Sequence, residues 1–118
     1  MVERRARRLT MRVSTAGGSL HALEASEGTT STRFASGTRA WELMPQALRE
    51  RVAPLNALHV KQRVFDRPNR LADLEPGDLC AVHAVLRRHL RTARPYLFVN
   101  QAMTVCITGL PQTESDAL

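Results

Sequence analysis

The sequence predicts a single α+β domain with a core of β-strands. At 118 residues the chain is long enough for one small domain and too short for two. Several short runs are rich in apolar and β-branched residues and are bounded by Pro, Gly or Asn, a pattern typical of strands. Two short helical segments that meet at Pro45 supply the helical part.

The N-terminal third predicts one strand and one helix. Residues 19–25 alternate between apolar and polar or small side chains, which indicates a strand with one buried face. A turn-rich stretch, residues 26–32, follows it. Ser36 is then a candidate N-cap for a helix that contains Trp41.

The middle of the chain predicts a second helix, a strand and a long loop. Pro45 ends the first helix and can occupy the first turn of the next one, over about residues 46–52. Residues 57–60 are predicted to form a strand. Residues 61–79 are polar and contain two prolines, so we expect an exposed loop with one short helical turn.

The C-terminal third predicts a β-hairpin, a further strand and a helix. Residues 79–87 and 96–99 are β-rich, and residues 89–95 between them have the composition of a hairpin connection. Residues 103–110 form a last apolar run, and Thr113 is a candidate cap for a helix that starts nearby.

The positive charge is concentrated at the N-terminus. The formal net charge is +6, and residues 1–14 carry five Arg against one Glu, a net of +4. Of the 17 basic residues only Lys61 is a lysine, a skew more typical of a GC-rich genome than of phosphate binding. The sequence therefore predicts a disordered basic arm over 1–14 and a folded domain over 15–118. The alternative is a small basic protein that binds nucleic acid through Arg4–Arg12.

No local pattern defines a complete active site. Cys80, His83 and His89 superficially resemble a metal site, but a structural zinc site needs a fourth ligand, and Cys80 and His83 on one strand would point to opposite faces. No His-x-Asp or His-x-Glu occurs, and neither Cys80 nor Cys106 has a neighbour that would activate a thiolate. We therefore predict no catalytic residue and no metal ligand from local chemistry.

The location of the protein and the redox state of its cysteines are predicted from segments and motifs that the sequence lacks. No apolar run approaches the roughly 18–20 residues of a membrane span, and the basic N-terminus lacks the apolar stretch of a secretory signal. The two cysteines lack CxxC spacing. A cytoplasmic protein with reduced thiols is expected.

Three segments, in order, resemble the taurine dioxygenase and 2,4-dichlorophenoxyacetate dioxygenase (TauD/TfdA) family. Residues 28–43 resemble a Gly-Gly-x-Thr-x-Phe-Ala stretch followed by a helix with Ala-Tyr/Trp-Glu-x-Leu-Pro. Residues 55–60 resemble the strand that follows that helix. Residues 82–105 resemble His-Pro-Val-Val-Arg-x-His-Pro followed by Leu-Phe-Val-Asn-x-x-Phe-Thr, and this block is the most specific.

The resemblance implies a partial double-stranded β-helix (jelly roll) with a helical hairpin insertion. It also implies Fe(II), held by a 2-His-1-carboxylate triad, and 2-oxoglutarate, whose oxidative decarboxylation to succinate and CO₂ accompanies hydroxylation of a small organic acid. Thr32 stands where the family has a threonine that binds 2-oxoglutarate. Phe98 stands at a pocket-lining aromatic position, and Asn100 ends the same strand, so both are predicted to line the substrate pocket.

The departures from the family pattern concern the iron. The family's His-x-Asp precedes the strand equivalent to 20–25, where this chain has its basic arm, and the distal His and the Arg that binds 2-oxoglutarate would lie beyond Leu118. Ala93 replaces a turn glycine. We therefore expect a fragment, inactive by itself, whose exposed sheet edges favour self-association. Alternatively, a separately encoded partner supplies the missing ligands.

Overall fold

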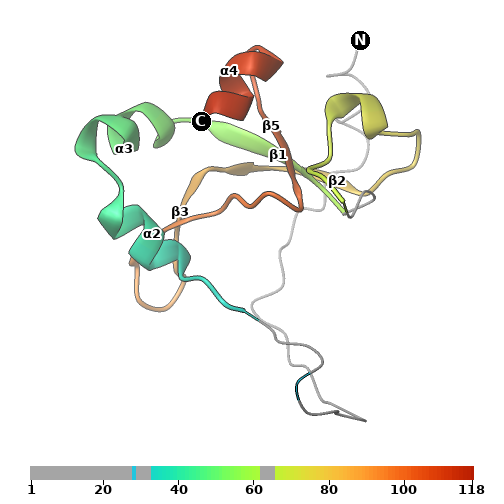
Figure 1. Ribbon diagram of the computed structural model, residues 1–118. Helices are drawn as coiled ribbons and strands as arrows, with labels where there is room; N and C mark the ends of the chain where they lie inside the picture. The colour runs from blue at the N-terminus through green and yellow to red at the C-terminus, as the bar shows by residue number, and fades with distance from the viewer. Residues whose placement is uncertain (1–27, 29–32, 62–65) are drawn as a thin grey trace.

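The computed structural model describes residue 28, residues 33–61 and residues 66–118 (Figure 1). The basic arm, the predicted strand over 19–25 and Thr32 lie outside the described residues. Within them the protein is α+β, with two antiparallel sheets and short helices.

Two consecutive helices start the described part. Helix α2 spans Gly37–Leu43, and the Ser36 side chain accepts a hydrogen bond from the backbone N–H of Arg39 at 3.2 Å, so the predicted N-cap is confirmed. Helix α3 spans Gln46–Val52, immediately after Pro45, as predicted. Proline suits this position because its fixed φ is compatible with the start of a helix and it has no N–H to leave unpaired.

A three-stranded sheet forms the centre of the fold. Its order is β2 (Cys80–Ala84), β1 (Asn56–Val60) and β5 (Thr104–Ile107), and both pairings are antiparallel (Figure 1). The strand predicted over 57–60 is therefore confirmed as the middle strand. Because side chains alternate along β1, Leu58 and Val60 face one side of the sheet while Ala57 and His59 face the other.

The β-rich run 79–87 is not one continuous strand. It breaks at Val85, whose N–H donates to the Leu55 carbonyl at 3.0 Å and whose carbonyl accepts from the Phe98 N–H at 2.8 Å. The chain continues as a hairpin of β3 (Leu86–Arg88) and β4 (Pro95–Leu97), which confirms the predicted hairpin connection. Helix α2 packs against β4.

Two apolar clusters lie on opposite faces of the central sheet. The first contains Leu58, Val60 and Cys80, covered by Leu71 and Leu74 from the loop that precedes β2. The second contains Val52 and Ala57, with Val85 and Ile107, and is covered by residues of α2, α3 and the C-terminus: Trp41, Met44, Leu48 and Leu118. Leu48 and Val52, four residues apart on α3, thus lie on the face of the helix that packs on the sheet.

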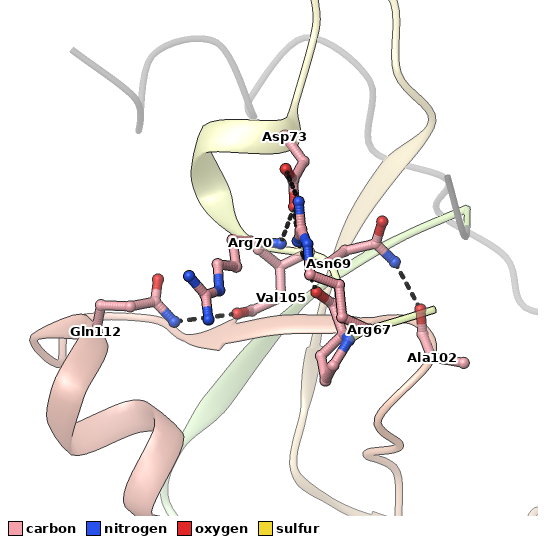
Figure 2. Close-up of polar contacts among 8 residues, drawn as sticks. Arg67, Asn69, Arg70, Asp73, Ala102, Val105 and Gln112 are labelled. Atoms are coloured by element: carbon pink, nitrogen blue, oxygen red, sulfur yellow. Dashed lines mark hydrogen bonds and ion pairs between the residues drawn. The ribbon is translucent and has the colours of Figure 1, made fainter. Parts of the chain in front are cut away.

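The loop before β2 contains the short helical turn that the sequence predicted. It contains the 3₁₀ helix η1 (Leu71–Asp73), and the Arg67 guanidinium makes two hydrogen bonds of 2.7 Å to the Asp73 carboxylate. The same carboxylate accepts from the Arg70 N–H, while the buried Asn69 side chain donates to the Ala102 carbonyl at 2.7 Å (Figure 2). Asn69 therefore fastens this loop to the turn before β5.

The last helix, α4 (Gln112–Ala117), starts earlier than predicted. Pro111 is its N-cap, and Thr113 lies inside the helix, so the prediction of Thr113 as the cap is wrong. Pro111 pre-sets the backbone for the first turn in the same way as Pro45 does for α3. The Ser115 side chain then accepts from the Ile107 N–H at 2.8 Å, which ties α4 to β5.

Candidate functional site

Two histidines and a phenylalanine meet where the central sheet faces the β3–β4 hairpin. His59 on β1 and His83 on β2 share one face of the sheet, with ring centroids 5.7 Å apart. Phe98, which follows β4, lies 5.2 Å from each of the two rings. The pairing register explains the contact, because Ala57 lies opposite His83, so His59 is its diagonal neighbour on the same face. We call His59, His83 and Phe98, with Arg87 and Tyr96, the histidine–aromatic cluster.

The hairpin contributes the outer members of this cluster. Arg87 and Tyr96 are register partners on β3 and β4. The Arg87 guanidinium lies over the Phe98 ring, 4.6 Å from its centroid, and the Tyr96 ring meets Phe98 edge-on at 6.2 Å. A cation over an aromatic face is attracted by the negative π-face, so Phe98 positions Arg87 beside the two histidines.

A β-bulge places a hydroxyl beside His59. The register of β5 against β1 shifts between Leu58 and His59, so Leu58 pairs with Cys106 but His59 pairs with Thr104. Thr104 Oγ1 consequently lies 3.4 Å from His59 Nδ1. Without the bulge Val105 would be the register partner, and His59 would have no hydroxyl at this position.

The cluster disfavours protonation of its histidines. Burial lowers the pKa of His59 below its ordinary 6.5, and the nearby charges of His83 and Arg87 lower it further. Burial also lowers the pKa of His83, with Arg87 as the second cause. Both imidazoles are therefore neutral at pH 7, in a setting whose fixed charge is positive.

The two predicted pocket residues lie in different surroundings. Phe98 lies at the centre of the histidine–aromatic cluster. Asn100 is exposed and its side-chain oxygen accepts from the Met103 N–H at 2.8 Å, which stabilises the turn before β5. Asn100 also lines a cavity of about 520 Å³ between α3, β5 and α4, and Phe98 is not among the residues that line it. Thr104 lines this cavity and contacts His59, so it lies between the two regions.

The residues of the superficial metal pattern do not converge. Cys80 is buried in the apolar cluster beneath η1, His83 faces the other side of the sheet, and His89 lies in the hairpin turn, where its Nδ1 accepts from the backbone of Thr92 at 3.2 Å. Cys80 and Cys106 are both free, and they lie on strands separated by β1, about 10 Å apart by strand spacing. Burial raises the pKa of each thiol, so neither is an activated nucleophile.

Iron has no ligand set in the described part of the chain. Among residue 28 and residues 33–61 and 66–118, no three His, Cys, Asp or Glu side chains could hold one metal ion. His59 and His83 supply two imidazoles at most, with Arg87 rather than a carboxylate beside them. The described residues therefore do not fit a 2-His-1-carboxylate iron centre.

The comparisons with known proteins agree with the expected family. The family model described as taurine catabolism dioxygenase TauD, TfdA family, matches residues 10–118. A crystal structure from Burkholderia xenovorans, described as a candidate alpha-ketoglutarate-dependent taurine dioxygenase, matches with a TM-score of 0.54 and 23% sequence identity. The match covers 70% of this chain and 26% of that one, so it concerns the fold of about a quarter of the larger protein.

The fold is that of an α+β protein with antiparallel sheets of the TauD type. This chain belongs to the TauD/TfdA family of 2-oxoglutarate-dependent dioxygenases. None of the described helices is long and apolar enough to cross a membrane.

The half-buried histidine pair was missed by the sequence reasoning. His83 was considered as a metal ligand and His59 only as part of the strand that resembles the family, and their separate strands gave no sign of a shared face. The available signal was the spacing of the strands: an antiparallel pairing of 56–60 with 80–84 brings the two histidines together.

Proposed function

We propose that this chain forms part of the β-helix of a cytoplasmic TauD/TfdA-type dioxygenase that hydroxylates a small organic acid. Family membership over residues 10–118 carries the proposal. It is supported by Phe98, the residue that the resemblance places in the substrate pocket, because Phe98 contacts His59, His83 and Arg87. In this proposal the histidine–aromatic cluster forms a wall of the pocket, and Thr32 contacts 2-oxoglutarate.

The chain by itself is proposed to lack oxidative activity. The reaction of the family depends on iron, and the described residues supply no set of three ligands. His59 and His83 lie beside Arg87, whose charge opposes a bound cation. A partner chain that supplies the His-x-Asp pair and the distal His would restore the family's ligand set.

The test is an anaerobic titration of the purified chain with Fe(II) and 2-oxoglutarate, followed by the visible charge-transfer absorption of the chelate. We expect no band and no succinate after oxygen is admitted, whereas a full-length family member in a parallel sample should show both. A band that saturates at one equivalent of Fe(II) would contradict the proposal. The variants His59→Gln and His83→Gln would then show whether the histidine pair is the new site.

A further inference from the structure

The outer side of β5 is closed by the part of the chain that follows it. Among the described strands β5 is an outer strand of the order β2-β1-β5, and one of its sides pairs with β1. The Thr108 N–H donates to the Asn56 carbonyl at 2.8 Å, toward β1. Because backbone groups alternate in direction along a strand, the N–H and C=O of Ile107 point away from β1. A further strand would pair with these outward groups.

Three outward backbone groups of β5 have partners in residues 110–115. The Ile107 N–H donates to Ser115 Oγ at 2.8 Å, and the Ile107 carbonyl accepts from the Leu110 N–H at 3.4 Å. The Val105 carbonyl, two residues earlier, accepts from Gln112 Nε2 at 3.4 Å (Figure 2). Val105 and Ile107 are both buried, so an N–H or C=O without a partner would be costly at these positions. Side chains of α4 thus take the place that a neighbouring strand would have.

Short-range features of the sequence bring α4 back onto this edge. Gly109 has φ of 83°, in the left-handed region that glycine adopts without strain, so the chain reverses directly after β5. Gln112 Nε2 also donates to Asp116 Oδ1 at 2.7 Å, one helical turn later, which restricts the orientation of the amide. Arg51 of α3 pairs with Glu114 at 2.7 Å, so α4 is attached to a second element. The sheet, the turn and α3 therefore all contribute to the position of α4.

We propose that Gln112 and Ser115 form an edge cap that keeps β5 from pairing with the same strand of a second copy of this chain. The two capped groups, the Ile107 N–H and the Val105 carbonyl, are complementary in such a dimer. In an antiparallel pair of β5 strands related by a two-fold axis at Cys106, Ile107 of each copy lies opposite Val105 of the other, so the N–H of one bonds to the carbonyl of the other. The edge cap occupies both groups and offers no new row of backbone donors and acceptors. The inference goes beyond the proposed function, since it requires neither iron nor 2-oxoglutarate.

The first measurement is hydrogen exchange of the backbone amides in the full, unmodified chain by NMR. We expect the Ile107 amide to exchange at a rate close to that of the Thr108 amide, although of the two only Thr108 pairs with β1. This protection should be independent of protein concentration, because the partner of Ile107 lies in the same chain. An Ile107 amide that exchanges like an exposed one, or that is protected only at high concentration, overturns the proposal.

Variants of α4 test the edge cap itself. The double variant Gln112→Met/Ser115→Ala removes both hydrogen bonds and keeps the approximate size of each side chain, so the edge becomes available to a second copy. We expect its association constant for dimer formation, measured by sedimentation equilibrium, to rise roughly tenfold or more over the wild type. Thr113→Ala, at an exposed position of the same helix, is the matched control and should change this constant by about twofold or less. Ser115→Thr keeps a hydroxyl and should behave like the wild type.

The exchange rate of the Ile107 amide distinguishes the remaining outcomes. In the double variant this amide should exchange faster than in the wild type at low protein concentration and regain its protection in the dimer. A double variant that stays as monomeric as Thr113→Ala, or that associates while the Ile107 amide remains unprotected, overturns the proposal. If the double variant does not fold, the single variant Ser115→Ala gives the same comparison, and the wild-type exchange rates still decide whether the edge cap exists.

Discussion

Thr104 lies opposite His59 across a β-bulge, and its Oγ1 is 3.4 Å from the Nδ1 atom of the His59 ring. The same oxygen accepts a hydrogen bond from the backbone N–H of Asn100 at 3.0 Å. The turn that carries Asn100 is therefore connected through one hydroxyl to the histidine–aromatic cluster. Phe98 contacts the ring of His59, and Asn100 bonds to Thr104. The Thr104 hydroxyl therefore connects the two residues that are predicted to line the substrate pocket, although they lie in different surroundings.

The stability of the fold should depend on pH through the histidine pair. Both folded pKa values lie below the ordinary 6.5, so the unfolded chain binds more protons just below that value. The contribution to stability is complete above about pH 6.5 and declines as the pH falls toward the folded pKa values. Each unit of difference corresponds to about 1.4 kcal/mol, and the more exposed His83 contributes less than His59 because water screens its charge.

Urea unfolding at about pH 5 and about pH 7.5 measures this dependence. The variant His59→Gln should flatten the curve between these values. The carboxylate of Asp73 does not interfere, because Arg67 and the Arg70 N–H hold its pKa far below this window. A wild-type midpoint that is the same at both pH values would contradict the lowered pKa values of the two half-buried histidines.

Asn69 should be essential to the loop before β2. Its side chain is 2% exposed and donates to the Ala102 carbonyl at 2.7 Å (Figure 2). Replacement by Leu removes this bond and leaves a carbonyl without its partner, so we expect a loss of about 1–3 kcal/mol in the free energy of unfolding. Asn56→Leu, at an exposed position of β1, is the matched control and should change it by about 0.5 kcal/mol or less.

Sequence reasoning identified the described helices and strands where local signals were strong. Ser36 and Pro45 act over one helical turn, so the cap and the helix boundary follow from residue type alone. Thr113 was misplaced because Pro111 two residues earlier fixes the start of α4, and both residues are acceptable near a helix N-terminus. The break at Val85 depends on hydrogen bonds to Leu55 and Phe98, distant partners that no local pattern reveals.

The candidate site was harder to predict for the same reason. Phe98 was identified through family resemblance, whereas the contact between His59 and His83 depends on strand register. The position of Thr104 beside His59 depends on a bulge that the sequence does not signal with a glycine. Register and bulges are set by the packing of whole strands, which lies beyond the reach of local propensity.

Replacing Ala93 by glycine should stabilise the hairpin. Ala93 has φ of 56°, in the left-handed region, at the position where the family resemblance expects a turn glycine. An L-residue pays about 1–2 kcal/mol in this region, partly offset by the greater freedom of glycine in the unfolded chain. We expect a net gain of about 0.5–1 kcal/mol in thermal or urea unfolding. The variant Ala72→Gly, in η1, should destabilise the protein instead. A gain in stability at this position would contradict the explanation from the left-handed φ of Ala93.

The reverse substitution, Gly37→Ala, should lower the free energy of unfolding. Gly37 is the first residue of α2, and a Cβ atom added there would lie 2.6 Å from the Leu97 carbonyl oxygen, a backbone atom that cannot move aside without displacing β4. Helix propensity alone favours alanine by about 1 kcal/mol. The steric conflict costs more, so Gly37→Ala should destabilise the protein by about 1–3 kcal/mol in urea unfolding. Ala40→Gly at an exposed position of the same helix reports propensity alone. If Gly37→Ala proved neutral or stabilising, the close approach of α2 to β4 would be wrong, and with it the placement of the hairpin that carries Phe98.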